Sequence, residues 1–253
     1  MPKDPEPTRV APTLLLTNDD GIDEPGLEAL RAAAGTRGRI YVVAPIAPHS
    51  NCSHAVTTHR PLRVHRRGED RLGIDGTPAD CVRLALHGLV PGPAWVLAGI
   101  NAGGNLGMDM LHSGTVAAAR EAALHGVPAI ALSHYRARGR AFDWPRAVGW
   151  AERVLELLLR RPSTPGTFWN VNFPHPGPDD PEPEIVECAV DPSPLPLRYR
   201  VEGEAAFYDG DYHARRRIAG RDVDVCFRGN IAVCLVPVAF GDTRLVNGSP
   251  ATS

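Results

Sequence analysis

The stretch Leu14–Gly21, which reads LLLTNDDG, decides the predicted fold. Its first half is an apolar run suited to a buried strand, and it stops at Asp19 and Asp20, two adjacent carboxylates followed by a glycine. In an open α/β sheet, ligands bind in the crevice outside the carboxyl ends of the strands, so acids at this place are candidates for function. The simpler alternative is that Asp19 begins a turn and Asp20 helps to cap the next helix.

The same order of strand, polar loop and helix recurs along the chain. The predicted helices begin at the capping residues Asp23, Thr77 and Ser113, and proline follows in the first turn of the first two. This alternation predicts an α/β, Rossmann-like, doubly wound and mostly parallel sheet with helices on both faces. The predicted strands are 14–17, 40–44, 62–64, 72–74, 95–100, 128–133 and 169–173, and the predicted helices are 25–35, 77–86, 113–126 and 147–159.

The last third of the chain differs in composition. Residues 174–196 are rich in proline and too irregular to form a compact core, and residues 221–226 and 231–238 resemble a β-hairpin. We therefore expect a catalytic core over residues 1–173 and, within the same domain, a C-terminal extension over residues 174–253. Such an extension can be a linker or an active-site lid, but an oligomerisation arm is the first expectation.

Composition excludes several classes of protein. The chain has 253 residues, a net charge of -2 and 22% charged residues, so it lacks the basic surface that a nucleic-acid polymer would require. No apolar segment is long enough to span a membrane, and the first ten residues do not resemble a signal peptide. Five widely spaced cysteines without a C-x-x-C pair argue against a disulfide framework. We expect a soluble, cytoplasmic protein with reduced thiols.

The polar residues after the predicted strands form a chemically coherent set. If the strands are parallel, four loops meet at one edge of the sheet. Carboxylate, hydroxyl and amide oxygens suit a hard divalent cation, Mg²⁺, Mn²⁺ or Ca²⁺, and a helix start with small hydroxyl residues suits a phosphate. Such an ion activates water, which suffices in principle for hydrolysis of a phosphomonoester. The residues are Asp19, Asp20, Ser50, Asn101, Asn105, Ser113, Gly114 and Thr115.

Four motifs resemble those of the SurE survival-protein family, in its order and approximate spacing from about Leu14 to Ser133. They read TNDDGI at 17–22, GTPADCV at 76–82, GINAG with NLG at 99–107, and SGTVAAA at 113–119. The resemblance extends more weakly to residues 170–174 and 222–224. It implies a Rossmann-like fold, a metal-dependent nucleoside monophosphate phosphatase, and dimers or tetramers assembled through the C-terminal extension.

The resemblance also implies roles for individual residues. One divalent cation per subunit would be held by Asp19, Asp20, Ser50 and Asn101. Phosphate or the attacking water would contact Asn105, Ser113, Gly114 and Thr115, and the catalytic set would be Asp19, Asn105 and Ser113. The substrate would be a small phosphorylated molecule, a nucleoside 5'-monophosphate or 3'-monophosphate.

This chain departs from the family pattern around the predicted site. The loop 46–51 lacks the usual Asp and arginines, and Asn51 stands where a glycine usually follows the serine. Gly104, Met108, His112 and Arg120 replace a usual proline, acid, tyrosine and methionine. The predicted metal ligands are unchanged, so we expect retained metal chemistry with altered selection of the leaving group, and the substrate could be a specialised phosphate ester.

Alternatives remain at this stage. Taken singly, Ser50 fits a loop hydroxyl, Asn101 and Asn105 fit turn residues, and Ser113 or Thr115 fits a helix cap. His49 or His112 could donate a proton to the leaving group. The histidines at 49, 54 and 59 could suggest zinc, although they lack helical spacing and an accompanying acid.

Other classes of enzyme fit less well. A haloacid-dehalogenase-type phosphatase would place its nucleophile at Asn18, which cannot form an aspartyl phosphate. The glycines at 99–107 do not follow the dinucleotide-binding spacing, and the P-loop motif is absent. From a different functional class, a catalytically silent nucleotide-binding or regulatory protein could retain the same scaffold.

Overall fold

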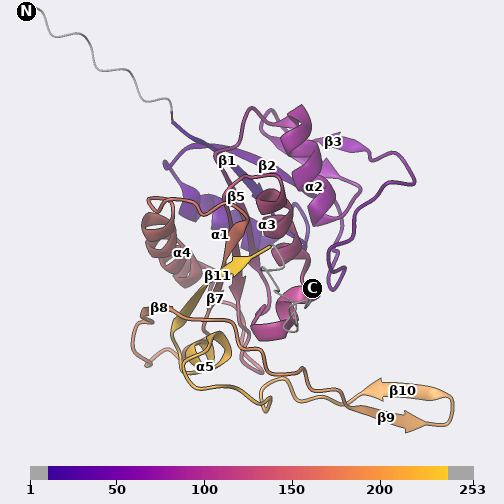
Figure 1. Cartoon of the computed structure of the whole chain (residues 1–253), viewed down its shortest axis with the longest axis vertical. Helices are drawn as coiled ribbons and strands as arrows, with labels where there is room; N and C mark the ends of the chain where they lie inside the picture. Colours follow the sequence, from indigo (N-terminus) through magenta and orange to yellow (C-terminus); the bar gives the residue numbers. More distant parts are fainter. Residues whose placement is uncertain (1–10, 239–253) are drawn as a thin grey trace, which may run out of the picture.

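A computed structural model describes residues 11–238 of the chain. A nine-stranded sheet forms the centre of the molecule, with strand order β3-β4-β2-β1-β5-β6-β7-β11-β8 (Figure 1). The strands are β1 Thr13–Thr17, β2 Arg39–Pro45, β3 Val64–Arg66, β4 Arg71–Ile74, β5 Trp95–Asn101, β6 Ala129–His134, β7 Thr167–Phe173, β8 Ile185–Glu187, β9 Tyr199–Glu202, β10 Ala205–Tyr208 and β11 Ile231–Pro237. The helices are α1 Pro25–Ala34, α2 Pro78–Leu84, α3 Gly114–Leu124, α4 Trp144–Leu158 and α5 Asp222–Phe227, with short turns η1 Ala85–Leu89 and η2 Gly107–Leu111.

The sheet is mostly parallel, as predicted. Strands β4, β2, β1, β5, β6 and β7 run in one direction, while β3 pairs antiparallel with β4 and β11 pairs antiparallel with β7. Because the six parallel strands share one direction, their carboxyl ends lie along the same edge of the sheet. The polar loops that carry the predicted site residues lie at this edge.

Two layers of helices bury the sheet, and β1 shows how its residues divide between them. Leu14 and Leu16 face one cluster with α1 and α4, whereas Leu15 faces the opposite cluster with α2 and α3. All three leucines are fully buried, which explains why this strand is a continuous apolar run. The observed fold is therefore the predicted doubly wound α/β architecture.

Local capping explains where the helices begin. Thr77 caps α2 through a reciprocal pair of hydrogen bonds with Asp80, and Ser113 caps α3 by accepting a hydrogen bond from the Val116 N–H at 3.1 Å. The prediction for α1 was wrong by one residue, because Pro25 opens the helix and makes Glu24 its N-cap. Asp23 instead accepts a hydrogen bond from Arg71 at 3.3 Å.

The hairpin predicted over residues 221–238 is also wrong. Residues Asp222–Phe227 form α5, and Ile231–Pro237 form β11 in the main sheet between β7 and β8. Strand β8 likewise comes from the proline-rich segment, so the main sheet continues past residue 173 into the predicted extension. Residues 239–253 of the predicted extension lie outside the described part of the chain.

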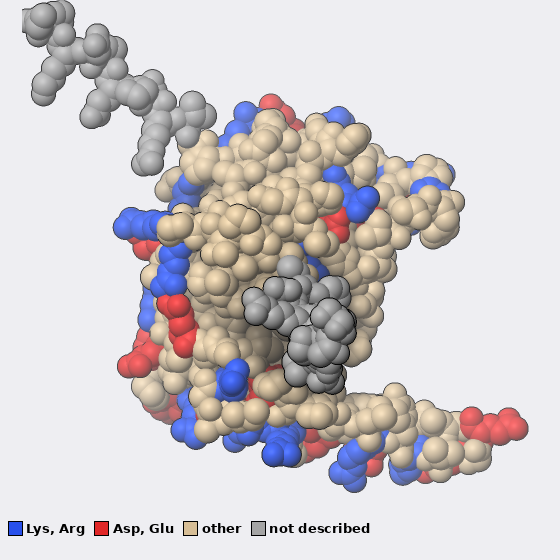
Figure 2. Space-filling model, viewed as in Figure 1, with Lys and Arg blue, Asp and Glu red and all other residues tan. Residues whose placement is uncertain are grey.

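A different segment forms a hairpin. Strands β9 and β10 pair antiparallel with each other and project from the body of the molecule (Figure 1). Exposed apolar side chains cover this hairpin, namely Tyr199, Val201, Phe207 and Tyr208. On the face shown in Figure 2, acidic and basic side chains lie interspersed. No helix in residues 11–238 has both the length and the apolar composition needed to cross a membrane.

Candidate active site

The acid pair lies at the point where the order of the strands reverses. Strand β2, which follows β1 in the chain, pairs with one edge of β1. Strand β5, which comes later, pairs with the other edge. Asp19 and Asp20 follow β1, and Asn101 is the last residue of β5. A crevice forms at such a reversal because the two chain connections leave in opposite directions, and it is the usual ligand site of these folds.

Short hydrogen bonds hold the acid turn in shape. The side chain of Asn18 donates to the Gly21 carbonyl at 2.7 Å, and Gly21 has a φ of 130°, which favours glycine. The His49 N–H donates to the Asp19 carbonyl at 2.8 Å, which attaches the loop after β2 to the same turn. Asn18 is therefore a structural residue of the turn.

Asp19 is almost fully buried, with 4% of its surface exposed. The Thr115 hydroxyl donates a hydrogen bond to Asp19 Oδ1 from the first turn of α3. Burial raises the pKa of Asp19 to about 6, with the Asp20 charge adding to the rise, although the Thr115 hydrogen bond opposes it. The folded protein therefore holds a carboxylate that a nearby cation would stabilise.

Asp20 is held by the loop after β5. The Ala102 N–H donates to Asp20 Oδ2 at 3.0 Å, and burial raises the pKa of Asp20 above its ordinary value although this hydrogen bond opposes the rise. None of the ion pairs within residues 11–238 includes Asp19 or Asp20. One buried and one half-buried carboxylate, adjacent and without a cationic side chain, are a suitable environment for a metal ion.

The remaining predicted ligands supply neutral oxygens. The pairing of β5 with β6 shifts register between Ala98 and Asn101, and this irregularity carries Asn101 to the edge of the crevice. The Asn101 Nδ2 donates to the Gly103 carbonyl at 2.8 Å, which leaves its side-chain oxygen for a ligand. Together with the Ser50 hydroxyl, the donor set consists of oxygen, which a hard cation such as Mg²⁺ or Mn²⁺ prefers.

A soft metal site is not found in the described part of the chain. Residues 11–238 contain no group of three or more His, Cys, Asp or Glu side chains with a metal-binding arrangement. Zinc sites usually draw on such groups. The set of two carboxylates, one amide and one hydroxyl supplies only oxygen, which a hard divalent ion prefers.

Asparagines of β7 hold Asn105 in place. The Asn105 N–H donates to Asn172 Oδ1 at 2.8 Å, and its carbonyl accepts from Asn170 at 2.9 Å and from Asn172 at 3.0 Å. Its side-chain Nδ2 donates to Ser133 Oγ at 2.8 Å. Two buried asparagines two positions apart on one strand indicate such a network, because buried amides need partners, and this signal was available in the sequence.

The predicted residues line one cavity of about 380 Å³. Its walls include Asp19, Asp20, Ser50, Asn101, Asn105 and Ser113, together with Asn51, Ala102, Gly104, Asp109, His112 and Tyr212. Gly114 and Thr115 lie behind Asp19 and are not part of this lining, and the Thr115 hydroxyl is engaged by Asp19. A larger cavity of about 640 Å³, lined by residues that include Arg83 and His125, contains none of the predicted site residues.

The C-terminal segment supplies one wall of the site cavity. Tyr212 lines it, and the Arg215 guanidinium lies 5.0 Å from the centre of the Tyr212 ring. Arg215 also pairs with Asp109 and donates to the Leu106 carbonyl at 2.9 Å. Sequence reasoning missed these residues because Tyr212 and Arg215 are more than ninety positions away from the loop they contact.

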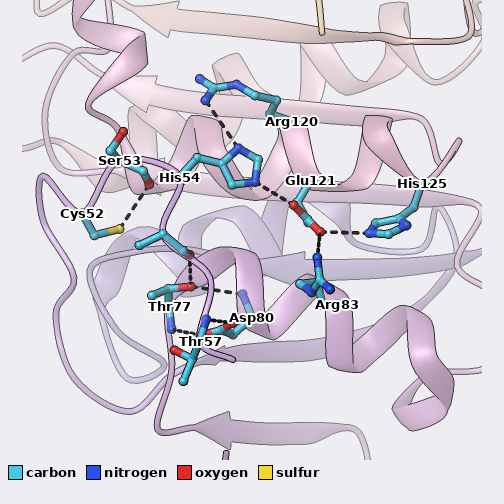
Figure 3. A network of polar contacts seen from close by, with 11 residues as sticks. Cys52, Ser53, His54, Thr57, Thr77, Asp80, Arg83, Arg120, Glu121 and His125 are labelled. Carbon is cyan, nitrogen blue, oxygen red and sulfur yellow. Dashed lines mark hydrogen bonds and ion pairs between the residues drawn. The ribbon is translucent and has the colours of Figure 1, made fainter. Parts of the chain in front are cut away.

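Figure 3 shows how the loop that carries Ser50 is anchored. His54 Nε2 donates to Glu121 at 2.6 Å, and Glu121, on α3, also accepts from Arg83 and His125, each at 2.9 Å. The Thr57 N–H donates to Asp80 at 2.8 Å, which joins the same loop to the capping box of α2. The helices therefore position the loop that brings Ser50 to the cavity.

The conformation of this loop explains one of its unusual residues. Asn51 has a φ of 56°, in the left-handed region that glycine adopts most easily. Asparagine is among the few other residues that adopt this region at small cost, so Asn51 fits a position that suits glycine.

The pattern of the survival protein SurE family matches residues 14–191 of this chain. The chain belongs to the SurE family. A relative from Nostoc sp. is 52% identical over 222 residues, which cover 87% of this chain and 97% of the relative. The 5'-nucleotidase SurE of Pelobacter propionicus is 39% identical over 220 residues, which cover 81% of this chain and 89% of that protein. The crystal structure of the SurE protein from Aquifex aeolicus matches with a TM-score of 0.82 and 28% identity, covering 93% of this chain and 97% of that one.

Two of the residues that the sequence analysis expects to depart from the family pattern lie in the cavity wall. Gly104 and His112 both line the cavity, and a Cβ atom on Gly104 would lie 3.4 Å from the Tyr212 hydroxyl. A side chain at position 104 would therefore contact the Tyr212 hydroxyl. Gly104 and His112 lie beside the oxygen donors and do not replace them, so they shape the cavity next to the donor set.

Proposed function

We propose that this protein is a divalent-metal-dependent phosphomonoesterase that hydrolyses nucleoside monophosphates, with 5'-monophosphates as the first substrate class. The observation that carries the proposal is the adjacent pair of buried Asp19 and half-buried Asp20, which has no cationic partner among the described residues and shares a cavity with neutral oxygen donors. Relatives named 5'-nucleotidase SurE support the same activity. Nucleoside 3'-monophosphates and specialised phosphate esters are the alternative substrates, because the cavity wall departs from the family pattern.

Four residues would hold the cation: Asp19, Asp20, Ser50 and Asn101. When bound there, a hard divalent ion would polarise the phosphoryl oxygen and lower the pKa of a water molecule. Thr115 orients the Asp19 carboxylate, and the Ala102 N–H orients that of Asp20. These contacts preorganise the ligands before substrate binds.

Asn105 and Ser113 would contact the phosphate or the attacking water. Asn105 is fixed on both sides of its backbone by Asn170 and Asn172, so its side chain has little freedom to move away from the cavity. Ser113 lines the cavity at the start of α3, where the helix dipole favours an anion. Rigid donors of this kind stabilise charge in a transition state more than flexible ones do.

We also propose that the protein acts as a homodimer or homotetramer in the cytoplasm. The projecting hairpin β9–β10 carries exposed Tyr199, Val201 and Tyr208 on one face and exposed Phe207 on the other, and exposed apolar side chains of this kind support a contact with a second copy. This assigns the oligomerisation role to residues 199–208.

Phosphate release after chelation tests the proposed activity. The chelated protein should release no phosphate from p-nitrophenyl phosphate or nucleoside monophosphates, and Mn²⁺ or Mg²⁺ should restore release. Asp20→Asn should reduce kcat by about 10²-fold or more, because it removes one charged ligand. Asp23→Asn is the matched control, since Asp23 is exposed and pairs with Arg71.

Two outcomes would contradict the proposal. Hydrolysis that is unchanged after chelation, or in Asp20→Asn, would remove the metal site from the mechanism. Nucleotide binding without turnover at any divalent ion would favour a catalytically silent regulatory protein. A screen over nucleoside 5'- and 3'-monophosphates, sugar phosphates and polyphosphate would then define the substrate class.

A further inference from the structure

Two cysteines face each other on neighbouring strands far from the acid pair in sequence. Strands β8 and β11 run parallel, with Val233 opposite Glu187, the last residue of β8, so continuing this register by one residue places Cys234 opposite Cys188. The Cys188 N–H donates to the Val233 carbonyl at 3.0 Å, which continues the ladder. The two Sγ atoms lie 3.7 Å apart.

The other three cysteines have no such partner. All five cysteines lie within residues 11–238, and all five are free thiols. Cys226 donates to the Phe173 carbonyl at 3.6 Å, Cys52 donates to a backbone carbonyl of its own loop, and Cys81 is a buried residue of α2. Only Cys188 and Cys234 contact each other.

The two thiols differ in exposure. Cys188 is half-buried, whereas Cys234 has 1% of its surface exposed and packs against the cluster below α2 and α3. A small oxidant therefore reaches Cys188 first. The hydrogen bond between the thiols lowers the pKa of Cys188 and raises that of Cys234, which gives Cys188 more of the reactive thiolate.

We propose that Cys188 and Cys234 form a site of oxidative modification, at which a peroxide produces an intramolecular disulfide. The Cys188 thiolate attacks one peroxide oxygen, the O–O bond breaks, and Cys188 becomes a sulfenic acid while the other oxygen leaves as an alcohol or water. The Cys234 sulfur then attacks the Cys188 sulfur, the S–S bond forms, and water leaves. Two electrons pass from the thiols to the peroxide, so one peroxide oxidises one pair.

The cross-link would enclose the part of the chain that forms the wall of the site cavity. Residues between Cys188 and Cys234 include the hairpin β9–β10, Tyr212, Arg215 and α5. Asp222, at the start of α5, accepts hydrogen bonds from the Gly107 N–H and the Asp191 N–H, each at 2.7 Å. A covalent bond across the ends of this segment reduces the freedom of the unfolded chain, so the oxidised protein should be more stable.

Intact mass and thiol counting on the full chain test this inference independently of any hydrolytic activity. The reduced protein is treated with a small excess of hydrogen peroxide, denatured, alkylated and digested. We expect the loss of two of the five thiols, a mass decrease of two hydrogen atoms, and a peptide that joins Cys188 to Cys234. Dithiothreitol should reverse all three changes, and the oxidised form should melt about 5–10 °C higher than the reduced form.

Variants provide the control. Cys188→Ser and Cys234→Ser should each prevent the mass decrease, while Cys52→Ser should leave it intact, because Cys52 is also half-buried but has no thiol neighbour. If Cys234→Ser fails to fold, the peptide map of the unaltered protein decides alone. Five remaining thiols, added oxygen at Cys188 without a cross-link, or a disulfide between two copies would overturn the inference.

Discussion

Gly114 and Asp19 lie so close together that a Cβ atom on Gly114 would be 2.8 Å from the Cβ of Asp19 and 3.0 Å from its Oδ2. The start of α3 therefore packs directly against the carboxylate that we place at the centre of the site. Thr115, the next residue, donates its hydroxyl to the same carboxylate. Helix α3 supports Asp19 through close contact and through a hydrogen bond.

Gly114→Ala should displace Asp19 and lower activity strongly. The added methyl group cannot fit without movement, and overpacking of this kind costs about 1–3 kcal/mol. A displacement near 1 Å at a catalytic group costs about 10²-fold in rate. Thermal unfolding and kcat measure the two effects. Gly149→Ala is the control, because a Cβ there meets open space within α4 and should stabilise the helix by about 0.5–1 kcal/mol. Full activity in Gly114→Ala would show that Asp19 tolerates the shift.

Asp19→Asn should stabilise the metal-free protein at neutral pH. The folded pKa of Asp19 is about 6, above its ordinary value of 3.8, so the folded state binds more protons than the unfolded chain between these values. Stability therefore falls as pH rises from about 4 to 6, by about 3 kcal/mol in total. Denaturant unfolding without metal should show this loss in the natural protein and not in Asp19→Asn.

Divalent ions supply the second half of this test. Mn²⁺ should restore stability to the natural protein above pH 6 and have little effect on Asp19→Asn, because ligand binding to the folded state stabilises it. Asp23→Asn, in the same loop, should behave like the natural protein. If the free energy of unfolding depended on pH equally in the natural protein and in Asp19→Asn, ionisation of Asp19 would not destabilise the folded protein.

Glu121→Gln should weaken the attachment of the loop that carries Ser50. Burial opposes ionisation of Glu121, but hydrogen bonds from His54, His125 and Arg83 outweigh it and lower its pKa to about 2, below the ordinary 4.5. The stability from Glu121 is therefore present above pH 4.5 and is lost as pH falls from 4.5 towards 2.

We expect Glu121→Gln to cost about 2 kcal/mol at pH 7, and the difference from the natural protein to shrink below pH 4.5. Chemical unfolding across this range measures it. Glu152→Gln is the matched control, since Glu152 is exposed on α4. A difference that stays constant between pH 7 and pH 3 would show that the charge of Glu121 is not what anchors the loop.

His112→Ala should slow hydrolysis of substrates with poor leaving groups. His112 lines the site cavity and His49 does not, so of these two histidines His112 is the one placed to donate a proton to a departing alkoxide. We expect a loss of about 10²-fold with a nucleoside monophosphate and little change with p-nitrophenyl phosphate, whose leaving group needs no proton. His49→Ala serves as the comparison. Unchanged rates for both substrates would remove histidine from the mechanism.

Charged substitutions on the hairpin should dissociate the assembly. Val201→Asp and Phe207→Asp place a carboxylate on exposed apolar surface of β9–β10, which should be unfavourable only if a second copy covers it. Light scattering after size-exclusion chromatography measures the mass. Leu124→Asp, on the exposed end of α3, is the control. A natural protein that is already monomeric would contradict the assigned role of the hairpin.

Local sequence patterns were sufficient to predict the fold of the first half of the molecule. The apolar run that ends at Asp19, the capping residues Thr77 and Ser113, and the alternation of strands and helices predicted the sheet correctly. Parallel strands place their carboxyl ends together, so this alternation also predicted that Asn101 and Ser50 would join the acid pair in one cavity. Each of these inferences depends on residues that are neighbours in sequence.

The C-terminal part could not be predicted in the same way. Residues 222–227 contain two valines, which favour strands, yet they form α5 because Val223 and Val225 pack against Leu106 and Ala232. Strand β11 pairs with β7, which lies about sixty positions earlier in the chain. No local pattern specifies such a partner.

The sequence by itself therefore determined the α/β architecture and the oxygen donors at the strand ends, since period, capping and strand direction are properties of short segments. Only the tertiary structure decided that Tyr212 lines the cavity with Arg215 packed against it, that Asn172 holds Asn105, and that Cys188 meets Cys234. These contacts join residues that are distant along the chain, and their formation depends on how the complete core packs.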